Sequence, residues 1–597
     1  MIGVLAAAFV HCLSFSWLKW GDILVDCGRD LDVARQLAEG RSLYSDVRYY
    51  YGPLAPCLNG SLFRIFGTHL NMVVAAGLVT TALMCWVLYR LARRFTGRTG
   101  SAAAAVAFLY ICAFGHLSAN GIFNFVLPYT PAATYGALTA AACLYFLVRH
   151  AQKWRASDFV LSLCFLALTA LTKVELLAAA LSLQAVFLAG AIWTRRAAWK
   201  LHGWGYAAAA AAIGAVYGCF LLRAGFSQVG RQNLFFSLDE QNHRFLLLNM
   251  GLLDVRASLL YLLYSILAAG AVFAAAFFST WQRVPAALRY VVAAGVPLTI
   301  YGVLIVAGVF SLEFPFRLLP LVSIGVLAVL GVEWFRRPER REALLPHVLL
   351  WLFSLACLSR MLLRTISYHY GFFMLPVGLV TIALLWFEYL PRWLCARGRP
   401  SAGFRLAGLG LLLGLTWAHY DRSVFAYGLH TAEASGPRGR LFLFNPPGRP
   451  QSGTYYAGAV RLLAEMPPAT RVLAAPQGVG LSFLSGLSSS FGLHGYIRPE
   501  LTGNYDDEHL LALLKAAPPE LVIRTTCDLS DYGPHQFGRD YAVKSWGWIE
   551  ANYVHCLSIG PKGFLTILNR KDVDPAPMLK KMAELQRAPA ADPTQRR

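Results

Sequence analysis

The sequence has little charge for its length. Only 14% of its 597 residues are Asp, Glu, Lys or Arg, whereas 57% are hydrophobic. A single soluble domain of this length is excluded, because it could not cover so much apolar surface with polar groups. The composition therefore indicates an integral membrane protein.

Several motifs of soluble enzymes are also missing. The sequence has no C-x-x-C pair and no Cys/His spacing typical of structural zinc. The stretch APQGVGLSFLSG (475–486) lacks both the G-x-G-x-x-G spacing and the P-loop lysine, which favours a connecting loop over a phosphate-binding loop. No internal repeat and no matched pair of glycine-broken spans is visible, which weakens a carrier function.

Long apolar runs, in contrast, are frequent. A helix of about 17–25 residues crosses the hydrocarbon core of a bilayer, and about thirteen such runs occur. They cover residues 1–18, 70–92, 100–117, 132–148, 157–172, 174–194, 204–222, 257–279, 287–309, 317–334, 344–363, 370–390 and 402–418. The first run has no charged n-region and no clear cleavage site, so we expect a retained span rather than a signal peptide.

The positive charges predict an orientation in a plasma or inner membrane. If the N-terminus is inside, every second junction carries two to four Arg or Lys residues, 20 in total. The alternate loops carry 14 in total, spread over longer sequence. The positive-inside rule then places the N-terminus in the cytoplasm. It places the first loop, 19–69, and everything after about 419 on the external side. The net charge of +21 comes largely from these anchors, so a nucleic-acid partner has little support.

The composition changes after residue 418. Pro and Gly cluster in SGPRGR and NPPGRPQSG, and the long apolar runs end. Strand-like segments then alternate with helical ones, at 471–475, 520–526, 554–560 and 564–570 for strands and at 455–466, 506–517 and 541–553 for helices. We expect a transmembrane domain over 1–418, an external α/β domain over 419–570 and a poorly ordered tail over 571–597.

Four cysteines would lie on the outer face, namely Cys27, Cys57, Cys527 and Cys556. Two disulfides could form there, and four cysteines allow three pairings.

The first external loop concentrates charge. In GDILVDCGRDLDVARQLAEG (21–40) the apolar spacing and the final glycine predict a helix. This helix would bring Asp22, Asp26 and Asp30 onto one face. Like charges on one stripe raise carboxylate pKa values, as a general base requires, and the alternative is a solvated acidic face.

The order of these features resembles a known group of enzymes. One span is followed by an external loop with D-x-x-R (26–29), a carboxylate three residues later, A-R-x-x-x-x-G (34–40) and the segment YYYGP (49–53). This arrangement resembles the GT-C superfamily of membrane glycosyltransferases. It is most similar to lipid A aminoarabinose transferases, protein O-mannosyltransferases and rhizobial lipopolysaccharide glycosyltransferases. It departs from the aminoarabinose transferases at Cys27 and Asp30, where those enzymes usually have Glu and Tyr.

The resemblance implies a GT-C-like helical membrane domain and a reaction. Such an enzyme moves a sugar from a polyprenyl-phosphate donor to an acceptor hydroxyl of a cell-envelope glycan, lipid or protein, with inversion at the anomeric carbon. Asp26 matches the family's catalytic aspartate, Arg29 its arginine and Asp32 its next acidic position. Asp30 is the second candidate for the base.

A donor phosphate at the outer interface needs cations. The candidates are Arg29, Lys173, Arg231, Arg317 and Arg364, with Arg244 and Arg360 considered beside them. A charge near a span costs several kcal/mol unless it is paired or faces a cavity. Lys173 and Glu175 also fit the outer turn of a helical hairpin, and Arg317 also fits interfacial snorkelling.

Further substrate contacts are expected from Asp32, Tyr49, Tyr50, Glu175, His369 and Tyr370. For the aromatic residues, anchoring at the membrane interface is the alternative. The stretch D-L-D (30–32) formally matches a metal-binding D-x-D, but some GT-C enzymes need no metal, so no cofactor is assigned and a divalent cation stays open.

Two rival functions remain. A transporter or flippase for a lipid-linked saccharide would need polar groups near the middle of the membrane, whereas nearly all charges here lie at span ends. A binding module on a membrane anchor would not need about thirteen spans.

The expected topology makes a first prediction. Single cysteines introduced at Ser42 and Ser452 should both be modified by a membrane-impermeant thiol reagent on intact cells, because both segments are expected outside. Arg337→Cys, at a cytoplasmic junction, should be protected and serves as the control. If only one of positions 42 and 452 is labelled, the number of spans between them differs from the predicted number by an odd number.

Overall fold

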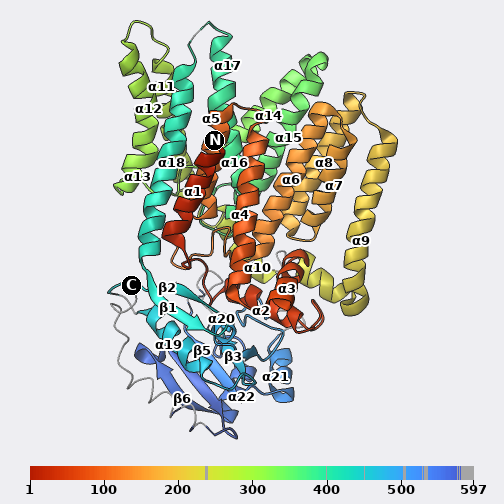
Figure 1. Ribbon diagram of the computed structural model, residues 1–597, viewed down its shortest axis with the longest axis vertical. Coiled ribbons are helices and arrows are strands. Elements are labelled where there is room, and N and C mark those ends of the chain that lie inside the picture. Colours follow the sequence, from red (N-terminus) through yellow and green to blue (C-terminus); the bar gives the residue numbers. More distant parts are fainter. Residues whose placement is uncertain are drawn as a thin grey trace.

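A computed structural model of the protein describes residues 1–574 apart from 236–239, 399, 449–450, 502–505, 528 and 530–535, together with residues 576 and 579. The predicted tail at 571–597 lies mostly outside these described residues. The chain forms a bundle of long helices, and an α/β region packs against one end of it (Figure 1).

The bundle consists of helices that coincide with the predicted spans. They are α1 (Ile2–Ser16), α4 (Leu70–Ala92), α5 (Arg98–Phe108), α6 (Pro131–Lys153), α7 (Ala156–Ala170), α8 (Val174–Trp193), α9 (Trp199–Val229), α11 (Val255–Phe278), α12 (Ala286–Leu298), α13 (Leu304–Val306), α14 (Leu319–Arg336), α15 (Arg341–Leu358), α16 (Pro376–Leu384), α17 (Leu390–Cys395) and α18 (Ala402–Gly428). The last, α18, packs against α5, α11 and α12.

Length and composition identify this bundle as membrane-spanning. Among the described residues, nine helices are long and apolar enough to cross a membrane, and α1, α7 and the helix at Arg98–Ala113 are shorter apolar helices. The predicted polytopic helical membrane protein is thereby confirmed. Its helices differ in burial: α6, rich in Ala, is buried along nearly all its length, whereas α9 stands at the edge of the bundle (Figure 1). Small residues allow such close helix packing in lipid.

The first loop folds into two short helices, α2 (Asp26–Ala38) and α3 (Leu54–Phe66). The expected helix over 21–40 is wrong at its start. Gly21 adopts φ +74°, and the Asp22 carboxylate accepts a hydrogen bond from the Leu24 amide at 2.8 Å, which closes a turn instead. Asp22 therefore does not share a helix face with Asp26 and Asp30.

The α/β region follows the expected order of elements. Its five-stranded sheet has the order β4-β3-β5-β7-β6. The strands are β3 (Arg471–Ala475), β4 (Ser488–Ser489), β5 (Leu521–Thr525), β6 (Tyr553–Ile559) and β7 (Leu565–Arg570). Strand β3 runs parallel to β4 and β5, and β7 runs antiparallel to β5 and β6. The predicted mixture of strands and helices is confirmed.

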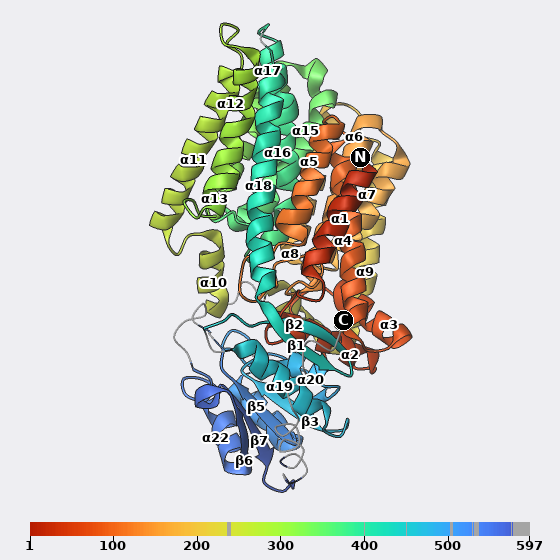
Figure 2. The same cartoon turned by 60° about the vertical axis from the view of Figure 1, so that its left-hand side comes forward.

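Helices and a hairpin complete this region. The helices are α19 (Ser452–Ala464), α20 (Val479–Leu484), α21 (Asp507–Ala516) and α22 (Val543–Asn552). The hairpin of β1 (His430–Gly436) and β2 (Gly439–Phe444) precedes them and had no counterpart in the sequence analysis. Helix α18 leads almost directly into β1 (Figure 2). The proposed domain boundary at 419 falls inside α18 and stays a prediction.

The α/β region packs back onto the first loop. The Phe442 amide donates to the Leu18 carbonyl at 2.8 Å, and the Arg48 amide donates to the Gly492 carbonyl at 2.9 Å. Both segments must therefore lie on the same side of a membrane, whichever side that is.

The glycine-bearing stretch 475–486 lies in this contact. The Gly480 amide donates to the Ile23 carbonyl at 3.1 Å, at the start of α20. A Cβ at Gly28 would collide with Gly480, and a Cβ at Gly480 would collide with Ile23. The two glycines thus allow α2 and α20 to touch. The Gly480 amide, which a phosphate-binding loop would offer to its ligand, is already bonded to the first loop.

The predicted outer-face disulfides are absent. All twelve cysteines, each within the described residues, are free, including Cys27, Cys57, Cys527 and Cys556.

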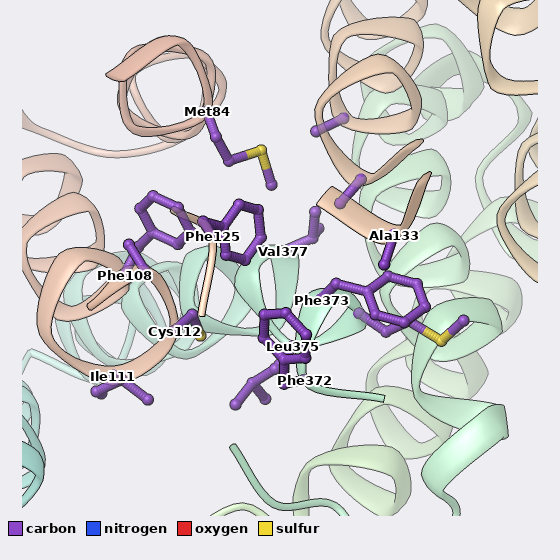
Figure 3. Close-up of a cluster of buried hydrophobic side chains, with 14 of the residues drawn as sticks. Met84, Phe108, Ile111, Cys112, Phe125, Ala133, Phe372, Phe373, Leu375 and Val377 are labelled. Carbon is purple, nitrogen blue, oxygen red and sulfur yellow. The ribbon is translucent and has the colours of Figure 1, made fainter. Parts of the chain in front are cut away.

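A cluster of buried hydrophobic side chains, several of them aromatic, packs between helices of the bundle (Figure 3). The Phe125 ring meets those of Phe108 and Phe372 edge-on, with centroids 5.1 and 5.6 Å apart. Such contacts fix the segments that carry Tyr129 and Tyr370.

Candidate active site

A pocket lies where the bundle, the first loop and the α/β region meet. It encloses about 650 Å³, including space open to solvent. Its charged lining consists of Asp26, Arg29, Lys173, Glu175, Arg360 and Glu500. Its other walls are Tyr51, Tyr129, Phe245, Leu246, Tyr370, Ile497 and Pro499. A few charged groups that converge among aromatic walls are typical of a small-molecule site.

Asp26 lies in the first turn of α2, where the helix N-terminus favours a negative charge. Its Oδ1 accepts a hydrogen bond from Arg29 Nη1 at 2.9 Å, and its Oδ2 accepts one from the Tyr370 hydroxyl at 3.0 Å. The Asp26 side chain keeps 15% of its surface exposed. A carboxylate held by two donors and open to a pocket can accept a proton from a bound hydroxyl.

Arg29 is buried among three carboxylates. Beyond Asp26, its Nη2 lies 3.2 Å from Asp30 Oδ2 and its Nη1 lies 3.5 Å from Glu500 Oε1. Burial disfavours its charged form, but Asp26 and Asp30 outweigh this and hold the pKa of Arg29 well above its ordinary value. The guanidinium is therefore always charged and is held by carboxylates on several sides.

Asp30 lies behind the pocket and is not part of its lining. Its Oδ1 accepts hydrogen bonds from the Tyr49 hydroxyl at 2.8 Å and from the Thr130 hydroxyl at 2.9 Å. Burial raises the pKa of Asp30, and Arg29 opposes the rise. The structure thus separates the two predicted bases: Asp26 faces the pocket and Asp30 faces the protein.

Two further cations, Lys173 and Arg360, line the pocket. Lys173 caps the start of α8, and its Nζ lies 3.9 Å from the centre of the Tyr51 ring and 3.9 Å from Glu175 Oε1. Burial lowers the pKa of Lys173 to about 8. Arg360 Nε lies 3.8 Å from the same Glu175 oxygen. The Glu175 carboxylate thus faces two cations, Lys173 and Arg360, and these three groups together carry a net positive charge.

Arg360 also has a free donor. Among the described residues, its buried Nη1 has no hydrogen-bond partner. A buried, unpaired guanidinium nitrogen is costly in an empty site, so a bound anion would stabilise it.

Asp32 lies in a separate buried network that joins α2 to the α/β region. Its Oδ1 accepts from Arg35 Nε at 2.7 Å, and its Oδ2 accepts from the Ser489 hydroxyl at 2.6 Å and lies 3.0 Å from His494 Nε2. Burial alone would raise the pKa of Asp32, but Arg35 and His494 hold it well below its usual range. The predicted D-x-D pair is thus divided, since Asp30 and Asp32 belong to different networks.

Within the part of the chain that the structure describes, no group of three or more His, Cys, Asp or Glu residues could hold a metal ion.

Four other predicted residues do not line the pocket. Arg317 pairs with Glu313 at 2.6 Å and donates to the Leu363 carbonyl. The Arg364 guanidinium contacts the Leu248 carbonyl at 3.5 Å. His369 is enclosed in its own turn, accepting from the Gly371 amide at 2.7 Å and donating to the Arg364 carbonyl at 2.8 Å. Arg231 is exposed on a π-helical turn, Gly230–Phe235. Their predicted roles remain predictions.

The three tyrosines of YYYGP have different surroundings. Tyr49 binds Asp30, as described above. The Tyr50 ring lies beside both Arg29 and Arg48, whose guanidinium carbons are 5.2 and 5.0 Å from its centre. Tyr51, which the sequence analysis did not select, lines the pocket beside Lys173.

Three further pocket residues were not selected from sequence. Tyr129 and Glu500 lie far from the first loop in the chain, and no local pattern connects them to it. Arg360 was considered only beside Arg364, and both precede the same aromatic segment. The structure separates these two arginines, since Arg360 lines the pocket and Arg364 does not.

Comparison with known proteins gives one family. Residues 51–217 match the family described as dolichyl-phosphate-mannose-protein mannosyltransferase. The matched stretch begins after α2, so it does not bear on the roles of Asp26, Arg29, Asp30 or Asp32. No curated protein matches the chain.

Two solved structures are similar at low sequence identity. The archaeal oligosaccharyltransferase AglB from Archaeoglobus fulgidus, in complex with an inhibitory peptide and a dolichol-phosphate, is 12% identical with a TM-score of 0.47, covering 96% of this chain and 74% of that one. ArnT from Cupriavidus metallidurans, bound to undecaprenyl phosphate, is 12% identical with a TM-score of 0.46, covering 95% of this chain and 97% of that one.

Proposed function

We propose that this chain is a membrane glycosyltransferase of the GT-C superfamily. It would transfer a sugar from a polyprenyl-phosphate donor to an acceptor hydroxyl, with inversion of the anomeric carbon. The observation that carries the proposal is that one pocket holds both a hydrogen-bonded carboxylate and two cations that face a single further carboxylate. The hydrogen-bonded carboxylate is Asp26, and the cations are Lys173 and Arg360.

The Asp26 carboxylate suits the acceptor. Asp26 would take the proton of the acceptor hydroxyl while that oxygen forms a bond to the anomeric carbon. The Tyr370 hydroxyl and Arg29 already hold both oxygens of Asp26, which fixes its direction. We propose that Arg29 orients this base, because its guanidinium is occupied by carboxylates, rather than contacting the donor phosphate.

The two cations suit the donor. As the bond between the anomeric carbon and the phosphate oxygen breaks, its electron pair passes to the polyprenyl phosphate. Lys173 and the unpaired Nη1 of Arg360 would stabilise this developing negative charge. Lys173 lies at the start of α8, and Arg360 lies just after the end of α15. A donor phosphate bound by them would enter the pocket while its isoprenoid remained in the bilayer.

We further propose that the pocket faces the external side of a plasma or inner membrane, with the N-terminus in the cytoplasm. The distribution of Arg and Lys supports this orientation. The acceptor would then be a cell-envelope glycan, lipid or protein.

The role of the base makes a prediction. Purified protein in detergent should transfer sugar from a polyprenyl-phosphate donor, and Asp26→Asn should lower kcat at least about 10²-fold because an amide cannot take the proton. Asp46→Asn, an exposed aspartate in the same loop, is the matched control and should leave kcat unchanged.

Two results would contradict this account. Near-normal transfer by Asp26→Asn would remove Asp26 as the base, and Asp30 would be tested next. If intact wild-type protein makes no product in detergent while proteoliposomes move lipid-linked sugar across the bilayer, the protein is a transporter.

The lowered pKa of Lys173 gives a pH prediction. The ammonium is charged below about pH 8 and neutral above it. If it binds the donor phosphate, kcat/KM for the donor should fall as pH rises through about 8, because this ratio reports groups of the free enzyme. Lys173→Arg, which stays charged, should remove that fall. An unchanged pH profile in Lys173→Arg would assign the titration to another group.

A further inference from the structure

The α/β region supplies one wall of the pocket. Ile497, Pro499 and Glu500 line it, whereas every other lining residue lies between residues 26 and 370. Glu500 is only 4% exposed. Its Oε1 faces Arg29 Nη1 at 3.5 Å, and this nitrogen also binds Asp26 at 2.9 Å. A side chain from the C-terminal region thus shares a hydrogen-bond donor with the proposed base.

Glu500 is held firmly in this position. Its main-chain carbonyl accepts a hydrogen bond from the Arg48 guanidinium, which lies against the Tyr50 ring. Gly495 provides space for the carboxylate, because a Cβ there would collide with it. The location of Glu500 relative to α2 is therefore set by packing and not by surface charge.

The contacts around Glu500 hold α2 and the α/β region in a fixed position relative to each other. Ser489 and His494 bind Asp32, one turn after Arg29 along α2. Closer to Asp26, the Gly480 amide binds the Ile23 carbonyl. Contacts on both sides of Arg29 thus hold α2 against the region that carries Glu500.

The charge balance argues for a role beyond docking. Arg29 already pairs with two carboxylates of its own helix, and Glu500 adds a third buried carboxylate to this cluster. Burial raises the pKa of Glu500, and Arg29 and then Arg48 oppose the rise. Glu500 therefore competes with Asp26 for the same nitrogen of Arg29.

We propose that Glu500 is a positioning residue for the transfer reaction, which sets the place of Arg29 relative to Asp26 and makes the α/β region part of the active site. The inference rests on the proposed role of Asp26 as the base. Without Glu500, Arg29 moves toward Asp26, and the carboxylate is both displaced and less able to accept a proton. Misplacement of about 1 Å at a reacting group can cost about 10²-fold in rate.

A double-mutant cycle in the detergent transfer assay tests this role. Glu500→Gln should lower kcat about 10-fold or more, with the KM for the polyprenyl donor and the Tm nearly unchanged. In the Arg29→Lys background, the same change should have less than about twofold effect, because residues that act through one another are not additive. Glu433→Gln, which removes the exposed ion pair with Arg440 in the same region, is the matched control and should match the wild type.

Each other outcome contradicts the proposal. A wild-type kcat in Glu500→Gln would show that Glu500 does not act through Arg29. The same would follow if Glu500→Gln and Arg29→Lys lowered kcat independently, so that the double mutant showed the product of the two effects. A fall in kcat that only follows a fall in Tm would mean that Glu500 serves docking alone. If Glu500→Gln does not fold, Glu500→Asp is measured in the same cycle, where the shorter acid should give a smaller, equally Arg29-dependent loss. A wild-type protein without transfer activity would overturn the proposed function itself, whereas an active wild type with a normal Glu500→Gln overturns this inference alone.

Discussion

The arrangement of the site depends on the buried guanidinium of Arg29. An arginine enclosed at 5% exposure requires carboxylates around it, since an unpaired buried charge costs several kcal/mol. Asp26 and Asp30 come from its own helix, and Glu500 comes from the α/β region. Through Asp30 the cluster reaches Tyr49 and Thr130, and through Asp26 it reaches Tyr370. One charge thus connects the first loop, the bundle and the C-terminal region.

The location of the pocket suits the proposed lipid-linked donor. Cations cannot be placed cheaply within the hydrocarbon core, and a phosphate cannot enter it. Lys173 immediately precedes the apolar helix Val174–Trp193, and Arg360 lies in the last turn of the apolar segment Pro338–Met361. Both face Glu175, and the Tyr51 ring covers Lys173. The same location allows a water-soluble region to close over the site from the other side, where Ile497, Pro499 and Glu500 meet it.

Much of the fold was predictable from sequence because a membrane requires each spanning backbone to satisfy its own hydrogen bonds, so long apolar runs become helices. The strands after 470 were predictable from short apolar segments that alternate with helical segments. The start of α2 was not, because the Asp22 carboxylate closes a turn that hydrophobic spacing does not reveal. Asp26, Arg29, Lys173, Glu175 and Tyr370 were selected and meet in one pocket. Glu500 and the choice of Arg360 over Arg364 depend on tertiary contacts between distant segments, which no local pattern records.

The most direct test of this account is an experimental structure of the protein with bound polyprenyl phosphate. The account predicts phosphate oxygens within hydrogen-bond distance of Lys173 Nζ and Arg360 Nη1, with the phosphate separated from Asp26 by space for a sugar. A phosphate bound instead at Arg231, Arg317 or Arg364, with the pocket between Asp26 and Lys173 empty, would contradict it.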